Sequence, residues 1–503
     1  MSTLPGDATI DGYVAGSAYP THVHADLMPA WLAAALRWQG VVPPPVRGPI
    51  RMLDIGCGDG IALTMTAASH PQGQFTGIDA MPGHAARGTA FGAAHGIGNV
   101  EIRCATFEDA LAGDAGRYDY IICQGVIAWV HAQNRARVLD LAARTLAPGG
   151  VFAVGYNAMP GWQDRLTMQR MLRDLAGETG GPPAARFDAA LDRVAGLREA
   201  GVYGLPQSRI DEVREMRGHV PGDYFPHEYL NTNWAPLWSS DVKAEMSARG
   251  LAFAGQAGFE RLRRDFYLKR AQRDALDGIA DPVLCDTLAD VFCNTAFRVD
   301  LYVREAVAGP PADLVGDVWL GALNTVDNTA FACRTPAGRL SFDNPAARHL
   351  LDALASGPRR FGDIVADADL ARADLCNAAD ALLTARHIQP VAPPHPLPHA
   401  GDMNRALLDA AFSATGPAVD ALIGTHGTIT LARNESLIAG TGTAALSARA
   451  AADPAFCARL FNPDTGPQDP EVLAAMASAR TGTLARLARL GVAIPPPGSL
   501  ACD

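Results

Sequence analysis

An aspartate followed by three alternating glycines is the pattern in this sequence that most plainly indicates ligand binding. Asp54 lies near the end of an apolar, strand-like run, and Gly56, Gly58 and Gly60 follow it before a segment of small residues with helical spacing. Glycines between a strand and a helix let the backbone approach a ligand more closely than a side chain would permit. A dinucleotide fingerprint would need glycine in place of Ile61, and no Lys-Ser/Thr pair follows for a phosphate-binding P-loop. Both of those nucleotide-binding loops are therefore excluded.

A second carboxylate follows at the end of the next predicted strand. The segment 74–79 reads as a strand that ends in Asp79, and an acid at that place can accept both ribose hydroxyls of a nucleoside. Further strands are predicted at 100–103, 119–123 and 151–154, with helical stretches between them. This alternation implies right-handed crossovers in a doubly wound parallel sheet, with the ligand at the carboxyl ends of the strands.

The acidic-x-Gly-x-Gly-x-Gly pattern resembles the first motif of the class I S-adenosylmethionine (SAM) methyltransferases. The resemblance implies an α/β, Rossmann-like fold and SAM as the cofactor. The residues expected at the cofactor are Asp54, Gly56, Cys57, Gly58, Gly60, Asp79, Ala80, Thr106, Phe107 and Gln124. Many of these enzymes have Asp at the end of the third strand, where this chain has Thr106-Phe107. The adenine amino contact is therefore expected from Glu108, Asp109 or the backbone.

A wider set of residues resembles one bacterial family within this class. Those enzymes carry an appended methyltransferase regulatory domain, and the family contains the protein-lysine methyltransferases that modify rickettsial outer-membrane protein B. The resemblance covers roughly residues 13 to 310. The residues that carry it are Tyr19-Pro20, Thr21-His22, Asp119 to Ile122, Gly125-Val126, Trp129-Val130, Tyr156-Asn157, Pro160 to Trp162, His227 to Leu230, Asp265-Phe266 and Phe297 to Val303.

Aromatic residues near the predicted fourth and fifth strand ends could build an acceptor site. Methyl transfer from a sulfonium depends mainly on positioning the nucleophile. An amine must also be neutral to attack, and an apolar aromatic vestibule would lower its pKa by desolvation. The predicted catalytic residues are Tyr156, Asn157, Tyr19 and Trp129. Gln124 and Asn157 could orient the nucleophile, whereas His131 or His227-Glu228 could serve as a base for a hydroxyl acceptor. Each of these side chains has core packing as its alternative.

The organisation predicted along the chain has four parts. A cap segment (1–45) precedes the methyltransferase domain (46–270), which carries a helical insertion at about 163–240, and the last two strands are predicted at 251–256 and 266–268 as an antiparallel hairpin. A winged-helix-like regulatory domain (271–395) and a helical domain (396–503) follow. Residues 341–391 hold seven Asp against five Arg and no Lys, which argues against DNA binding and favours protein docking or dimerisation.

Composition indicates which partners, which thiol state and which cellular compartment suit the protein. The chain of 503 residues has 53 acidic against 42 basic residues, which argues mildly against a nucleic-acid partner. Nine scattered cysteines without a C-x-x-C pair suit reduced thiols rather than zinc or disulfides. No apolar run approaches membrane-spanning length. We therefore expect a cytoplasmic protein without membrane insertion or a metal, and the family resemblance implies a homodimer.

Three functions remain open from the sequence. The first is a SAM-dependent methyltransferase that acts on lysine side chains of a protein substrate. The second is a small-molecule N- or O-methyltransferase of a biosynthetic pathway, because the same fold serves many acceptors. The third is a non-catalytic SAM-binding regulator. The acceptor pocket would be built from loops without a sequence pattern, so the sequence does not choose among the acceptors.

Overall fold

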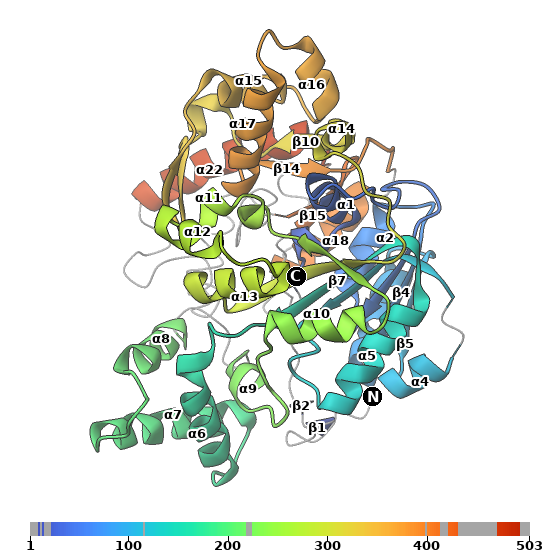
Figure 1. Cartoon of the computed structure of the whole chain (residues 1–503). Coiled ribbons are helices and arrows are strands. Elements are labelled where there is room, and N and C mark those ends of the chain that lie inside the picture. Colours follow the sequence, from blue (N-terminus) through green and yellow to red (C-terminus); the bar gives the residue numbers. More distant parts are fainter. Residues whose placement is uncertain are drawn as a thin grey trace.

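A seven-stranded sheet forms the centre of the molecule (Figure 1). The computed structural model describes residues 9–10, 13–14, 22–113, 116–217, 224–397, 400–412, 421–430 and 470–492. The strands of the sheet follow the order β5-β4-β3-β6-β7-β9-β8. Their bounds are β3 Arg51–Ile55, β4 Gln74–Asp79, β5 Val100–Cys104, β6 Tyr118–Gln124, β7 Leu146–Asn157, β8 Ala252–Gln256 and β9 Phe297–Val303.

The order of the strands reverses between β3 and β6. The chain adds β4 and β5 on one side of β3, then crosses over to place β6 and β7 on the other side, all parallel. Only β9 runs antiparallel, between β7 and β8. The loops that leave β3 and β6 therefore diverge, which opens a crevice at the carboxyl ends of these strands. The predicted doubly wound α/β fold is confirmed.

Helices cover both faces of the sheet, so its central strands are buried on both sides. On one face, α1 (Pro29–Trp38) and α2 (Ile61–Ala68) pack Leu32 and Leu63 against Met52. On the other face, α5 (Ala132–Thr145) and α10 (Ser239–Ser247) pack Val138 and Met246 in the core of β6 and β7. The remaining helices near the sheet are α3 Pro82–Ala94 and α4 Phe107–Ala112.

Four helices between β7 and α10 form a separate lobe, at the lower left in Figure 1. They are α6 Leu166–Gly177, α7 Pro183–Glu199, α8 Gln207–Arg217 and α9 Tyr224–Tyr229. The lobe has its own apolar core, in which Phe187 stacks on Phe225 with the ring centroids 5.1 Å apart. This lobe occupies the place of the predicted helical insertion, and α9 returns the chain to the edge of the sheet.

The predicted strand at 266–268 is wrong. Residues 264–267 form the short helix α11 (Arg264–Tyr267), and α12 (Arg270–Leu276) and α13 (Pro282–Cys293) follow before the last strand, β9. The apolar triplet at 266–268 is buried without strand pairing: Tyr267 and Leu268 pack with Cys285 and Ala289 of α13, and Phe266 belongs to a different apolar core, with Trp31. A short apolar run does not by itself distinguish a strand from a buried helical turn. The sheet therefore extends past residue 270, to Val303.

The C-terminal part, at the top of Figure 1, combines helices with small sheets. Strands β13-β10-β14 (Arg359–Arg360, Trp319–Ala322 and Ile388–Val391) form one sheet, and β11 (Ala332–Thr335) pairs with β12 (Gly338–Ser341). The helices predicted in the winged-helix-like region are present as α15 Pro345–Ala353, α16 Phe361–Asp367 and α17 Arg372–Thr384. We call residues 319–391 the C-terminal module.

Beyond the C-terminal module, the tail contains a β-hairpin as well as the predicted helices. Helices α18 (Ala400–Phe412) and α22 (Pro470–Arg489) are present, but β15 (Ala421–Gly424) and β16 (Gly427–Thr430) form a hairpin between them. The turn at Thr425 to Gly427 permits this pairing because Gly427 adopts a positive φ. Among the described residues, no helix combines the length and apolar character needed to cross a membrane.

A buried ionic cluster joins β9 to β7 and α13. The guanidinium of Arg298, which is 1% exposed, donates to Asp300 and Asp286 at 2.9 Å each and also to Asp290. The Tyr156 hydroxyl donates to Asp300 at 2.6 Å. A buried ion pair is costly to break, because removing one partner leaves the opposite charge without solvation. The cluster therefore fixes the edge of the sheet at which the cavity described below opens.

We expect Arg298→Met to lower the free energy of unfolding by about 3–5 kcal/mol, because the fully buried Asp300 loses its ion pair, while Asp286 and Asp290 keep only Lys243 and Arg261. Urea denaturation of the purified protein measures the change. Arg348→Met is the matched control: its side chain is 48% exposed and pairs with Asp343, so solvent screens the pair and the urea midpoint should stay close to that of the parent. Equal midpoints for the two variants would show that the cluster does not stabilise the fold.

Candidate active site

A cavity of about 950 Å³ lies at the carboxyl ends of β3, β4, β6 and β7. Four parts of the chain form its walls: the segment 22–28, the strand ends with their loops, helix α9, and a residue of the C-terminal module. Within the predicted cap segment, residues 22–28 line the cavity, whereas α1 is buried against the sheet.

The glycine loop forms one wall of this cavity. A side chain added at Gly58 would meet no protein atom within 4 Å, and Gly58 itself lines the cavity, so the added atoms would take ligand space. A Cβ at Gly56 would instead lie 2.4 Å from Cγ2 of Val126, which makes this glycine necessary for packing. Gly60 does not line the cavity; it precedes α2 with φ +66°, a conformation that favours glycine. Its role is therefore to begin the helix.

Asp79 is held at the cavity by the backbone on either side of it. Its Oδ2 accepts from the Gly58 amide at 3.0 Å and its Oδ1 accepts from the Met81 amide at 2.9 Å. The His84 Nδ1 lies 3.3 Å from the same Oδ1. The position that the sequence predicted for a ribose-binding acid is thus rigidly fixed, with lone pairs left for a ligand. His84 was missed, although its place five residues after Asp79 at the start of a helix was a usable signal.

Asp54 is a buried carboxylic acid that also lines the cavity. Burial, and next the negative charge of Asp79, raise the pKa of Asp54 to about 7. A cation bound beside it would favour the ionised form and lower this pKa. SAM carries two cationic groups, the ammonium and the sulfonium, so a carboxylate at this place suits it. The pKa of Cys57, beside the same carboxylates, is raised by burial, so its thiol stays protonated.

Residues that follow β5 line the end of the cavity at which the sequence predicts the adenine ring. Thr106 and Phe107 line the cavity, whereas Glu108 is bound to Arg137 at 2.6 Å, outside it. Asp109 forms a capping box with Thr106, whose hydroxyl donates to the Asp109 carboxylate at 2.6 Å. Both acidic side chains therefore have partners elsewhere, which leaves the backbone at 106–107 as the remaining candidate for the predicted contact to an adenine amino group. Ala80 lines the same end.

The other end of the cavity lies beyond β6 and β7, where Gln124, Trp129 and Asn157 line it as the sequence predicted. The Gln124 Oε1 is buried and has no hydrogen-bond partner among the described residues, so it is available to a ligand. Trp162 also lines this end, and its ring packs edge-on against Trp234, which in turn contacts Trp129. The two lining tryptophans thus belong to one rigid aromatic cluster.

The predicted catalytic residues include two tyrosines, Tyr156 and Tyr19. Tyr156 does not line the cavity; its side chain is fully buried and its hydroxyl is committed to Asp300 in the ionic cluster. The alternation of a strand turns Tyr156 away from the face that its neighbour Asn157 presents, so its prediction as a catalytic residue is not supported by its position. Tyr19 lies outside the described residues. His131, weighed as a base, accepts from the Asn134 amide as the N-cap of α5 and lies outside the cavity.

Several lining residues were absent from the predicted site. Helix α9 contributes Tyr224, His227 and Glu228, and burial raises the pKa of Glu228 to about 7. Asp26 comes from the N-terminal segment and Arg386 from the C-terminal module. The sequence named His227-Glu228 only as a base for hydroxyl acceptors. Arg386 carried no signal, because its place in the cavity depends on the packing of segments over 300 residues apart.

These residues fit SAM. The cavity offers backbone space at Gly58, fixed carboxylates at Asp54 and Asp79, and an unpartnered amide oxygen at Gln124. Pockets of 300–1,000 Å³ are typical for ligands of this size, and the cavity extends past the cofactor residues to the aromatic end. The space beyond the cofactor residues is therefore available to an acceptor.

Two family models match the chain. Residues 52–150 match a model described as a methyltransferase domain, and residues 221–304 match one described as a predicted methyltransferase regulatory domain. The first match covers the strands β3 to β6 with the glycine loop and Asp79. The second covers α9, the ionic cluster and β9, so part of the cavity wall belongs to the segment described as regulatory.

Individual relatives agree with these matches. A Synechocystis protein described as uncharacterized is 24% identical over 365 residues, 71% of each chain. A trans-aconitate 2-methyltransferase of Methylobacterium nodulans is 32% identical over 151 residues, 29% of this chain and 51% of that protein. The structure of PKMT2 from Rickettsia typhi in complex with AdoHcy is similar over 94% of this chain and 100% of that chain, with a TM-score of 0.66 and 17% identity.

We expect SAM affinity to depend on pH through Asp54. Only the ionised carboxylate attracts the cationic cofactor, and its pKa of about 7 leaves much of it protonated in slightly acidic solution. The dissociation constant should therefore rise as the pH falls below 7, by up to about tenfold per pH unit. Calorimetry between pH 6 and 8 measures it, and in Asp54→Asn the dependence should disappear. A parent enzyme with constant affinity across this range would exclude the role of Asp54.

Proposed function

Since this chain is a SAM-dependent methyltransferase with a methyltransferase regulatory domain, we propose that it methylates lysine side chains of a protein substrate. The observation that carries the proposal is the composition of the acceptor end of the cavity. Aromatic rings and one carboxylate lie together there, which is the environment that an alkylammonium group prefers. The residues concerned are Trp129, Trp162, Tyr224, Phe297 and Glu228.

Glu228 is placed to receive the proton that a lysine must lose. Burial raises its pKa to about 7, while Arg165 and a hydrogen bond with Tyr224 oppose the shift. Among the described residues, Glu228 has no ion pair that would hold its charge permanently. It can therefore accept a proton from the entering ammonium near neutral pH, which leaves a neutral amine and a protonated carboxyl group. The surrounding rings lower the pKa of the amine by desolvation and so assist this transfer.

The remaining residues act by orientation and by excluding water. SAM supplies, when bound, an electrophilic methyl group on a sulfonium, whose thioether product is a good leaving group. The amides of Gln124 and Asn157 line the same end of the cavity as Trp129 and can hold the amine in line. Asn157 is 5% exposed and its backbone carbonyl accepts from Leu237 at 2.9 Å, so its side chain starts from a fixed position.

The resemblance of the sequence to rickettsial protein-lysine methyltransferases supports a protein acceptor, as does the likeness of fold to PKMT2 over nearly the whole of both chains. The local similarity to trans-aconitate 2-methyltransferases favours instead a small-molecule O-methyltransferase. A tricarboxylate acceptor would, however, meet the Glu228 carboxyl group at the acceptor end, where its charge would be repelled. The cationic acceptor is therefore the better match to this cavity.

We expect radiolabelled SAM and a lysate of the host cell to give label in protein rather than in small molecules. Glu228→Gln should lower this transfer by about 10²–10⁴-fold, because the amine keeps its proton, and should leave SAM affinity unchanged. The rate of the parent enzyme should rise with pH through about 7, and the variant should lose that limb. Glu178→Gln, an exposed acid on the same helical lobe, is the matched control.

Label found only in small molecules would contradict the protein acceptor. Full activity of Glu228→Gln with label still in protein would contradict the role of Glu228 alone. A variant that loses both SAM affinity and activity would indicate damage to the cavity, and Glu228→Asp, which keeps the carboxyl group, should then restore part of the rate.

We also propose that the protein acts in the cytoplasm as a homodimer, with the helical lobe or the C-terminal region at the interface. The family resemblance motivates this expectation, and the helical lobe projects from the rest of the molecule in Figure 1. Light scattering of the purified protein at micromolar concentrations should give twice the chain mass of 52.8 kDa. A constant monomer mass over that range would contradict the dimer.

A further inference from the structure

Arg386 occupies a backbone position at which glycine is preferred. It follows α17, and it has φ +55°, one of three positive values among the non-glycine residues that the structure describes. The Arg386 amide donates to Leu383 at 3.1 Å and the His387 amide donates to Leu382 at 2.9 Å. This is the Schellman arrangement that ends a helix, and its left-handed residue is usually glycine. A long side chain at such a place is strained, and strain of this kind clusters at functional sites.

The side chain of Arg386 reaches the cavity. Among the described residues that line the cavity, Arg386 is the only arginine, and none is a lysine. Its guanidinium lies over the ring of Trp31, 5.5 Å from the centroid. Its charge opposes the rise that burial causes in the pKa of Asp26, which also lines the cavity. The guanidinium is thus held by a ring on one side and remains available to a ligand in the cavity.

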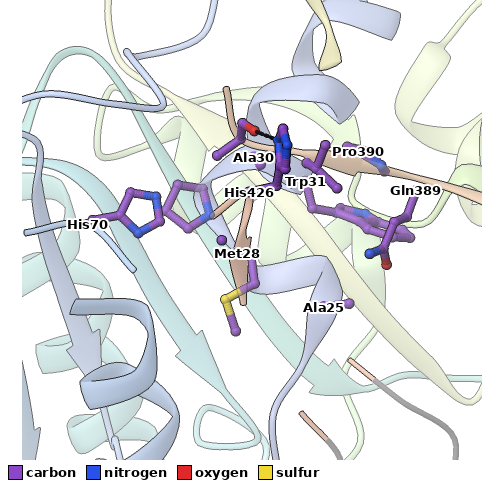
Figure 2. A pocket seen from close by; sticks show the side chains of 12 residues that line it. Ala25, Met28, Ala30, Trp31, His70, Gln389, Pro390 and His426 are labelled. Atoms are coloured by element: carbon purple, nitrogen blue, oxygen red, sulfur yellow. Dashed lines mark hydrogen bonds between the residues drawn. The ribbon is translucent and has the colours of Figure 1, made fainter. Parts of the chain in front are cut away.

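The C-terminal module is firmly packed where Arg386 enters. Figure 2 shows Met28 of the segment 22–28 and Trp31 of α1 beside Gln389 and Pro390 of β14 and His426 of the hairpin. These residues surround a cavity of about 20 Å³. This volume is enough for about one water molecule. The Trp31 indole donates to the Ala257 carbonyl at 2.7 Å, which fixes the ring under the guanidinium. Arg386 is therefore positioned where α1 and the segment before it pack against the C-terminal module.

Charge complementarity identifies the group that Arg386 meets. The other strongly ionisable side chains at the cavity are carboxylic acids, among them Asp26, Asp54, Asp79 and Glu228. These acids suit the cationic groups of SAM and of a lysine acceptor, but they would repel the carboxylate of the methionine moiety. A guanidinium binds a carboxylate through two parallel hydrogen bonds. We propose that Arg386 binds the carboxylate of SAM, so that the C-terminal module completes the cofactor site.

Calorimetry with two ligands tests this assignment. SAM and decarboxylated SAM differ only in the carboxylate, and we expect the parent enzyme to bind SAM about 10-fold or more tightly, the range of a charge-assisted hydrogen bond. Arg386→Gln should weaken SAM binding by a similar factor and leave the binding of decarboxylated SAM within about twofold. Arg386→Lys, which keeps the charge but not the planar fork, should fall between them.

Arg348→Gln is the matched control, since it removes one positive charge from the same module at an exposed position outside the cavity. It should bind both ligands like the parent. The proposal is overturned if the parent does not distinguish the two ligands, or if Arg386→Gln keeps the full distinction. Thermal unfolding without ligand checks the fold of each variant, and if Arg386→Gln does not fold, the comparison of the two ligands with Arg386→Lys decides.

Discussion

The reversal of strand order between β3 and β6 is the constraint on which the rest of the site depends. Because right-handed crossovers place β4 and β5 on one side of β3 and β6 and β7 on the other, the loops that follow these strands must separate. Asp54 lies in β3 and the glycine loop follows that strand, Asp79 ends β4, and Gln124 ends β6. The topology of the sheet therefore brings to one crevice the residues that local strand and turn patterns place along the chain.

The acceptor end depends on a different set of forces. In the register of β7 and β9, Asn157 lies opposite Phe297, and both line the cavity. The ionic cluster begins one residue away: Arg298 follows Phe297, and the Tyr156 hydroxyl of β7 donates to Asp300 of β9, which holds the two strands together. Arg298 and Asp300 lie in the segment that matches the regulatory domain. A segment described as regulatory thus supplies both a wall of the acceptor space and the interactions that stabilise that wall. Its influence on catalysis needs no long-range transmission, because it contacts the acceptor space directly.

The two proposals give the appended parts of the chain separate tasks. Helix α9 provides Glu228 at the acceptor end, and the C-terminal module provides Arg386 at the cofactor end. Glu228 is half-buried and Arg386 is exposed, so an interaction with an opposite charge is strengthened more at Glu228 than at Arg386. A methyltransferase core with the cofactor loop alone would lack both charges.

The sequence by itself determined the cofactor half of the site, because local patterns specify it. Asp54, the glycines and Asp79 stand at fixed distances from predictable strands, and period and turn chemistry are local properties. Tyr156 shows the limit: the sequence placed it at a strand end, but only the pairing of β7 with β9 turned its hydroxyl to Asp300. Glu228 and Arg386 reach the cavity through packing of distant segments. Such contacts have no spacing along the chain, so only the tertiary structure decided them.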